Sequence, residues 1–154
     1  MHGYKHILFS TDFSEAADFA FDFAVDLANR YDAALHVLHV LPELAAQFWR
    51  GYVDGAADIE NKTRAEIDAK FAAYAGRVPA GREIKAVVRF GKPGEEILDY
   101  AKSSGADLIV LGRQRHVSIF SGNTAMQVAK AAECPVLVLP LEFKRRVKAR
   151  EVAT

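Results

Sequence analysis

The sequence lacks the features that mark secreted and membrane-inserted proteins. Its single cysteine, Cys134, excludes a disulfide within the chain and therefore a disulfide-stabilised scaffold. No segment approaches the roughly 18 consecutive apolar residues that a membrane span needs. The apolar run at residues 7–9 is too short for a signal-peptide core. These absences predict a cytoplasmic protein that has no membrane partner.

An excess of charge of one sign is also missing. The chain has 20 Lys and Arg residues against 20 Asp and Glu residues, which gives no electrostatic basis for binding nucleic acid along a broad surface. A hydrophobic content of 51% in 154 residues is typical of one globular domain. We expect this domain to span residues 1–142. Residues 143–154 form a basic tail that we expect to be solvated, with Lys144, Arg145, Arg146, Lys148 and Arg150.

Motifs for catalysis or metal binding are absent from the sequence. There is no Ser-His-Asp ordering, zinc pattern or dinucleotide fingerprint, and no nucleophile is paired with a base. His36 and His39 are three residues apart in a predicted strand, so they point to opposite faces and cannot share a metal. Cys134 is predicted to be a buried, inert thiol. The chain is therefore predicted not to be an enzyme.

Apolar periodicity predicts alternating strands and helices. Strands are expected at residues 5–11, 35–41, 84–90, 107–111 and 135–139, and helices at 17–31, 56–75, 93–105 and 124–132. Asp12 and Ser14 offer N-cap chemistry to the first helix. Five strands alternating with four helices predict an α/β fold with a parallel sheet covered on both faces, a three-layer sandwich.

Aromatic residues cluster after the second strand, at Phe48, Trp49 and Tyr52. One interpretation is a short helix or loop that packs these aromatics onto the sheet. The other is a lid or a partner surface, because Trp and Tyr are common interface anchors.

Ligands of open parallel sheets bind outside the carboxyl ends of the strands, where the strand order reverses. If the first and fourth strands are neighbours, this crevice is lined by Thr11, Asp12 and Gly112, and glycine allows a close backbone approach. The loop after Gly112 ends at Gly122, Asn123 and Thr124, where free N–H groups at a helix start favour an anion. The alternative is an ordinary strand-to-helix loop with a cap.

Five segments in the expected order resemble the universal stress protein family: residues 5–14 (KHILFSTDFS), 38–40 (LHV), 91–93 (GKP), 106–112 (ADLIVLG) and 134–140 (CPVLVLP). The resemblance implies an adenine-nucleotide α-hydrolase-like fold with an open five-stranded parallel sheet in the order 3-2-1-4-5. It also implies a homodimer through the fifth strand, formed by Val136, Leu137, Val138 and Leu139.

One branch of this family binds ATP through the motif G-x2-G-x9-G-[ST]. Gly112 and Gly122 match its first and last glycines, whereas Arg115 replaces the middle glycine and Asn123 replaces the final Ser or Thr. The spacing from Arg115 to Gly122 is three residues shorter than the motif. By the same resemblance Asp12 would contact the base and Val40 would belong to the adenine pocket. Arg113 and Arg115 could supply charge to an anion in a different manner.

Three functions follow, in order of preference. The first is a non-enzymatic stress-response homodimer with weak, altered or absent ATP binding. The second is a regulatory switch of the same family that binds ATP or AMP, the two candidate ligands. The third is a nucleotide-using hydrolase, for which the sequence names neither a phosphate-holding loop nor a group that delivers a nucleophile.

Overall fold

The fold is a five-stranded parallel sheet with the order β3-β2-β1-β4-β5. The structure is a computed structural model that describes residues 3–49, 56–114 and 123–153, with 47–49, 56–60 and 123 described by their backbone only. The strands are β1 (His6–Ser10), β2 (Ala34–Leu41), β3 (Ile84–Phe90), β4 (Leu108–Arg113) and β5 (Val136–Pro140). The predicted strand order is confirmed.

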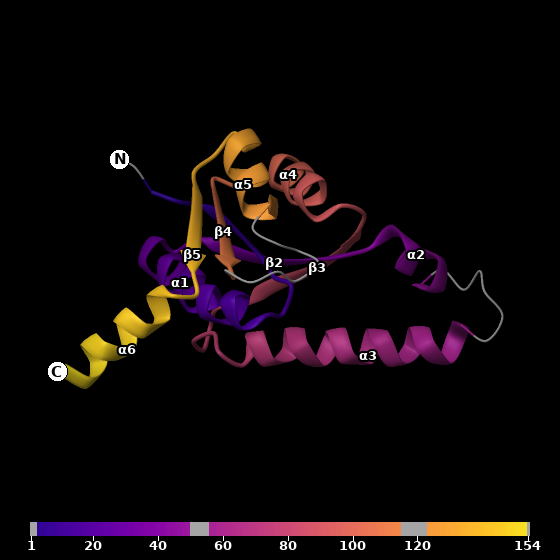
Figure 1. The fold of residues 1–154 in the computed structure, drawn as a ribbon, viewed down its shortest axis with the longest axis horizontal. Coiled ribbons are helices and arrows are strands. Elements are labelled where there is room, and N and C mark those ends of the chain that lie inside the picture. Colours follow the sequence, from indigo (N-terminus) through magenta and orange to yellow (C-terminus); the bar gives the residue numbers. More distant parts are fainter. Residues whose placement is uncertain (1–2, 50–55, 115–122, 154) are drawn as a thin grey trace.

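Helices cover both faces of the sheet (Figure 1). They are α1 (Glu15–Tyr31), α2 (Glu43–Trp49), α3 (Ala56–Ala75), α4 (Pro93–Ser104), α5 (Asn123–Ala131) and α6 (Phe143–Ala153). Helices α1 and α3 pack on one face over the odd-numbered residues of β1, β2 and β5, whereas α4 and α5 pack on the other. Val110 in β4 is fully buried, as a strand covered on both faces requires.

Local signals explain where the helices begin and end. Ser14 caps α1 by accepting a hydrogen bond from the N–H of Ala17 over 3.2 Å. Pro93 occupies the first turn of α4, and Gly105 ends that helix in the left-handed conformation, φ 73°. The bounds predicted for α3 and β3 are those observed.

Two described helices add to the four whose bounds were predicted, and the first of them lies where a short helix or loop was one interpretation. Helix α2 follows β2 and contacts α3 and β3, while the side chains of Phe48 and Trp49, and all of Tyr52, lie outside the described residues. The basic tail forms α6, a helix that was not predicted, and the absence of any buried residue in α6 agrees with the expected solvation. The charge run indicated solvent exposure, but Lys, Arg and Ala are also good helix formers, and this second property decides the backbone. None of the described helices combines the length and hydrophobicity that a membrane crossing requires.

Candidate functional site

The candidate site is the crevice at the carboxyl ends of β1 and β4, where the strand order reverses. Ser10 at the end of β1 is level with Leu38 in β2 and with Leu111 in β4. Thr11 continues this edge, since its N–H donates to the carbonyl of Leu38 over 2.8 Å. The backbone therefore brings Thr11, Asp12 and Gly112 to one end of the sheet, as the crevice prediction requires.

The Thr11 hydroxyl takes part in a chain of hydrogen bonds inside the fold. Its Oγ1 lies 2.7 Å from the Tyr74 hydroxyl and accepts the N–H of Phe13 over 2.9 Å. Tyr74 donates its own proton to Asp18 over 2.7 Å, so Thr11 must donate to Tyr74. Thr11 is only 4% exposed. Its one proton is used, and the side chain points toward α3, away from the face covered by α4 and α5.

Tyr74 of α3 joins its helix to β1 and α1, because its ring packs on Phe9 and Phe21 and its hydroxyl bonds to Asp18. Burial is the main cause that raises the pKa of its phenol, and the hydrogen bond to Asp18 adds to this effect. The group therefore stays a neutral donor throughout the physiological range. Sequence reasoning missed this role, since Tyr74 has the pattern of an ordinary apolar position on the buried side of α3.

His39 lies beneath the same turn. Its Nδ1 donates to the carbonyl of Thr11 over 2.8 Å, and its ring centre lies 4.4 Å from that of Phe13 with the two planes tilted by 43°. Burial lowers the pKa of His39, which favours the neutral ring. On the opposite face, Nδ1 of His36 lies 2.8 Å from the Tyr100 hydroxyl. The predicted separation of the two histidines is confirmed, and they form no common metal site.

Phe13 adopts a left-handed backbone conformation with φ 59°, which a residue with a Cβ rarely takes. Its ring is held by His39, by Phe71 at 5.6 Å and by Tyr74 at 5.9 Å. The ammonium of Lys70 lies 5.0 Å above the ring centre. These contacts fix the turn that leads from β1 to α1.

Asp12 and Val40 stand at the other side of this turn. Asp12 is exposed and accepts the N–H of Ser14 over 3.0 Å with one carboxylate oxygen, while the other makes no hydrogen bond or ion pair with a described residue. Val40 is 5% exposed and belongs to the core under α4 and α5. Of the two residues that the resemblance assigned to the base, Val40 thus lies on the α4 and α5 side of the sheet and Asp12 lies at the edge of the sheet.

Gly112 is required by the packing of α1. A Cβ at this position would collide with the backbone carbonyl of Ala16 and would lie 2.7 Å from the N atom of Ala17. Helix α1 therefore rests directly on the end of β4. The close backbone approach that the structure shows at this glycine is that of helix α1.

The remaining predicted residues are only partly described. Arg113 ends β4 half-buried, and its carbonyl accepts the N–H of Leu141 over 2.9 Å. Asn123 begins α5, and Thr124 follows half-buried in the first turn. Arg115 and Gly122 lie outside the described residues. Where the chain is described, no group of three or more His, Cys, Asp or Glu side chains could hold a metal.

Basic side chains near the carboxyl end of the sheet come from α6, the segment that was predicted to be a solvated tail. A hollow of about 560 Å³ beside Gln114 is lined by Lys144, Arg145 and Lys148 of α6. Lys144 is paired with Glu15 in the first turn of α1 over 3.1 Å. The missed signal was the helical propensity of the charge run.

The family is shown by comparison with known proteins. Residues 3–140 match the model of the universal stress protein family. The chain belongs to the universal stress protein family. Universal stress protein G of Shigella flexneri is 31% identical over 142 residues, which covers 88% of this chain and 99% of that protein.

Solved structures of universal stress proteins share the fold. UspA from Lactobacillus plantarum is 28% identical with a TM-score of 0.74, over 90% of this chain and 99% of that one. A universal stress protein from Archaeoglobus fulgidus in complex with dAMP is 21% identical with a TM-score of 0.63, over 89% and 98% of the two chains. The adenine-nucleotide α-hydrolase-like fold predicted for this family member is confirmed.

Substituting Gly112 by alanine tests why the glycine is there. We expect Gly112→Ala to lower the free energy of unfolding by about 1–3 kcal/mol, because the added methyl group forces α1 away from β4. Chemical denaturation of the purified protein measures this loss.

Gly76→Ala is the matched control. A Cβ there meets only backbone oxygens at 3.6 Å, an ordinary contact, so we expect a change within about 0.5 kcal/mol. Equal stabilities of the two variants would show that α1 does not rest on Gly112.

Proposed function

We propose that this universal stress protein is a non-enzymatic stress-response homodimer whose binding of ATP is weak, altered or absent. The observation that carries the proposal is that two crevice groups already serve the fold. The Thr11 hydroxyl donates its one proton to Tyr74 and accepts the N–H of Phe13, and the open side of Gly112 faces α1. Neither group is left to hold a phosphate chain.

The sequence of the phosphate loop supports the same proposal. Arg115 stands where the ATP-binding motif has its middle glycine, and three residues are missing before Gly122. A glycine that takes a left-handed conformation is poorly replaced by arginine, at a cost of about 1–3 kcal/mol. A shorter loop also changes which N–H groups reach the β- and γ-phosphates.

A second candidate is a regulatory protein that binds a nucleoside monophosphate. It is favoured by the neighbour from Archaeoglobus fulgidus that was solved with dAMP, a ligand with one phosphate. A monophosphate needs no cradle for the β- and γ-phosphates. Asp12 and Val40 on the base side, and Thr124 at the start of α5, suffice for such a ligand in the proposed arrangement.

Calorimetric titration separates these functions. We expect MgATP to bind with a dissociation constant weaker than about 10 μM, which corresponds to about −7 kcal/mol. Titration with AMP under the same conditions tests the second candidate. Tighter binding of MgATP would contradict the leading proposal.

Two variants locate any binding that is observed. Asp12→Ala removes the proposed contact to the base, and Thr124→Ala removes a hydroxyl at the start of α5. Both should weaken the binding of AMP or ATP if the nucleotide occupies the crevice. Unchanged affinity in both variants would place the ligand elsewhere on the protein.

The dimer is proposed to form through β5. This strand is at the edge of the sheet and presents unpaired N–H and C=O groups on its outer side. Val136 and Val138 pack toward α4 and α5, and Leu137 and Leu139 pack toward α1. A two-fold axis sets the same strand of two chains side by side, and Pro135 and Pro140 limit the length of the pairing.

Val138→Lys tests this seam. Val138 is the middle residue of β5, so the two lysines would face each other across the axis, and like charges directly opposite destabilise a strand pair. We expect sedimentation at micromolar concentration to show twice the 17.0 kDa chain mass for the unmodified protein and a monomer for the variant.

Val87→Lys is the control at the opposite edge of the sheet. Val87 in β3 is also half-buried and also packs toward α4, so a lysine there perturbs the core in a similar way. It should leave the dimer intact. A dimer that persists in Val138→Lys would reject β5 as the seam, and a monomeric unmodified protein would reject the dimer.

A further inference from the structure

A hollow of about 490 Å³ lies between α4 and α5, at the other end of β4 from the crevice. Gly105 and Ala106, which line the hollow, precede β4, whereas Gly112 of the crevice stands near the end of that strand. A volume of this size is typical of sites for small molecules. A ligand in this hollow would therefore be separate from a nucleotide in the crevice.

The hollow exists because small residues stand where the two helices end. Gly105 follows α4, and Ala131 and Ala132 stand at the end of α5. Their side chains are too short to fill the space between the helices. Leu98 of α4 and the fully buried Ile109 of β4 line the same space. The hollow thus offers an apolar surface to a ligand.

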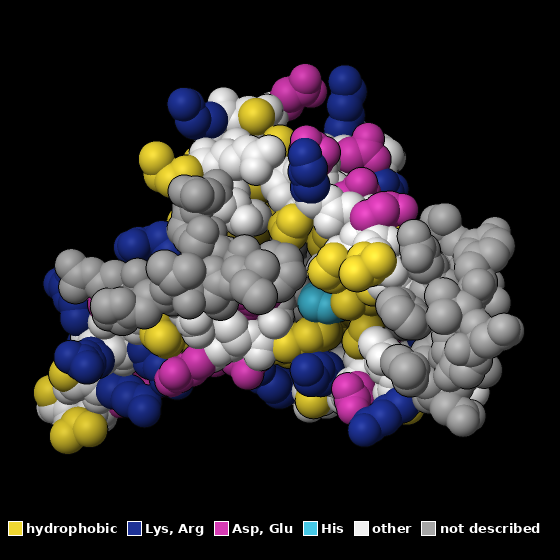
Figure 2. Space-filling view, turned by 45° about the vertical axis from the view of Figure 1, so that its right-hand side comes forward, with side chains coloured by type: hydrophobic (Ala, Val, Ile, Leu, Met, Phe, Trp, Pro, Cys, Tyr) yellow, Lys and Arg dark blue, Asp and Glu magenta, His cyan; other side chains and the backbone are white. Residues whose placement is uncertain are grey.

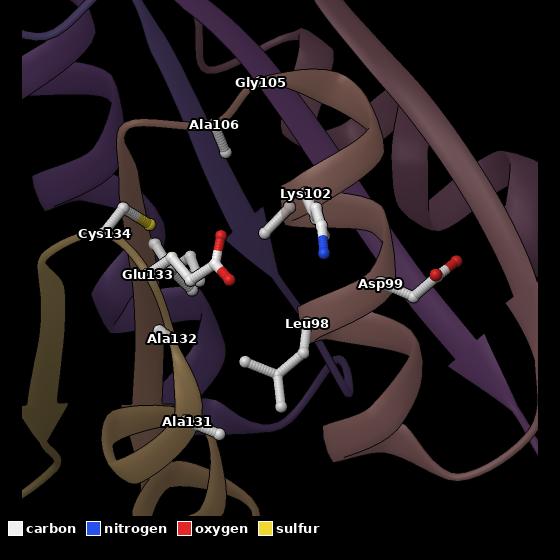
Figure 3. A pocket seen from close by; sticks show the side chains of 11 residues that line it. Leu98, Asp99, Lys102, Gly105, Ala106, Ala131, Ala132, Glu133 and Cys134 are labelled. Carbon is white, nitrogen blue, oxygen red and sulfur yellow. The ribbon is translucent and has the colours of Figure 1, made fainter.

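Two opposite charges face each other across this apolar surface. Figure 3 shows the carboxylate of Glu133 and the ammonium of Lys102 directed into the hollow from opposite sides. Both residues are exposed, and neither makes a hydrogen bond or an ion pair with another described residue. The two groups therefore do not neutralise each other, and each can bind a ligand group of the opposite charge.

The third charged residue that lines the hollow is already paired. Asp99 accepts a hydrogen bond from Arg89 over 2.6 Å, and Figure 3 shows its carboxylate pointing away from the hollow. Figure 2 shows acidic and basic side chains interspersed over α4 and α5, at the top of the view, without a region of one sign. A ligand that carries charge of only one sign is therefore not favoured here.

The arrangement of the two unpaired charges indicates the chemistry of the ligand. Because Lys102 and Glu133 come from opposite sides and do not touch, a molecule that binds both needs a carboxylate and an ammonium group at separate points. In an amino acid both groups are attached to one carbon atom. In a dipeptide they are at the two ends, and apolar side chains lie between them.

The only cysteine of the chain can report whether the hollow is occupied. Cys134 is half-buried, whereas the sequence predicts a buried thiol, and Figure 3 shows its sulfur directed into the hollow. Burial, and then the charge of Asp107, raise the pKa of this thiol. Cys134 is therefore a poor nucleophile, in agreement with the predicted inert thiol, and serves as a probe of the site rather than as a reacting group.

We propose that the hollow between α4 and α5 binds a dipeptide with free termini and apolar side chains. Lys102 binds its carboxylate, Glu133 binds its ammonium group, and its side chains lie against Leu98 and Ile109. This site is independent of the proposed nucleotide function, so a failure of either proposal leaves the other in place.

Protection of Cys134 tests the site in the full-length protein. Methyl methanethiosulfonate, a small neutral thiol reagent, is added at about pH 7, where the amino group of a dipeptide, with a pKa of about 7.7–8.0, is still mostly protonated. Mass spectrometry follows the rate of modification with and without leucyl-leucine. We expect about 10 mM peptide to slow the reaction about tenfold, as a dissociation constant of about 1 mM requires.

Two derivatives of the peptide separate charge recognition from apolar binding. N-acetyl-leucyl-leucine lacks the ammonium group, and leucyl-leucinamide lacks the carboxylate, while both keep the apolar side chains. Each should bind about threefold to fivefold more weakly than leucyl-leucine, the size of one exposed ion pair. Equal protection by all three peptides would overturn the assignment of the two charges.

Substitution of the two charged residues locates the peptide. Lys102→Met and Glu133→Gln should each weaken the binding of leucyl-leucine about threefold to fivefold. Lys102→Met should not affect leucyl-leucinamide, which has no carboxylate to lose. Glu133→Gln likewise should not affect N-acetyl-leucyl-leucine. Titration calorimetry with the same peptides gives a second measure that does not depend on the thiol.

Lys130→Met and Glu95→Gln are the matched controls. They make the same changes on exposed residues of α5 and α4 that do not line the hollow, and they should leave the protection of Cys134 unchanged. The proposal is overturned if leucyl-leucine neither protects Cys134 nor gives a calorimetric signal. It is also overturned if binding is unchanged in both Lys102→Met and Glu133→Gln, or if the controls weaken binding as much as these variants do.

Discussion

Helix α1 rests on the end of β4 without an intervening side chain, and the shape of the crevice depends on this contact. Gly112 allows it, because any Cβ there would collide with the backbone of Ala16. The approach pins the first turn of α1 at the carboxyl edge of the sheet. Phe13, in the turn that joins β1 to this end of α1, has the left-handed backbone conformation.

The same contact determines which crevice groups remain for a ligand. With α1 in this position, Asp18 reaches Tyr74, and Tyr74 reaches Thr11, so the hydroxyl nearest the end of β1 is used by the fold. Asp12 and Val40 are left on the base side, and Thr124 is left at the start of α5. The proposal of weak or absent ATP binding rests on this use of the crevice by the fold.

Much of the fold was predictable, because its signals are local. Pro93, Gly105 and the Ser14 cap mark helix ends within a few residues, and the buried strands are short apolar runs bounded by turn residues. The crevice followed from topology alone. Helix α6 was missed because a charge run indicates solvent exposure and says little about backbone conformation.

The contacts that crevice residues make within the fold could not be predicted in the same way. Thr11 and Tyr74 are 63 residues apart, and no pattern in either segment names the other. The sequence also does not reveal which neighbour requires a glycine at position 112, since glycine allows the close approach of a ligand and of a helix backbone equally well. A hollow between α4 and α5 joins Leu98, Ile109 and Glu133 from three segments, which only the packing of these helices brings together.

A double-mutant cycle of Thr11→Val and Tyr74→Phe tests most directly whether the crevice hydroxyl serves the fold. Each substitution should lower the free energy of unfolding by about 1 kcal/mol, the usual net value of a hydrogen bond. The double variant should lose less than the sum of the two, with a coupling energy of at least about 0.5 kcal/mol. Strictly additive losses, together with weaker nucleotide binding in Thr11→Val, would show instead that the hydroxyl is held for a ligand.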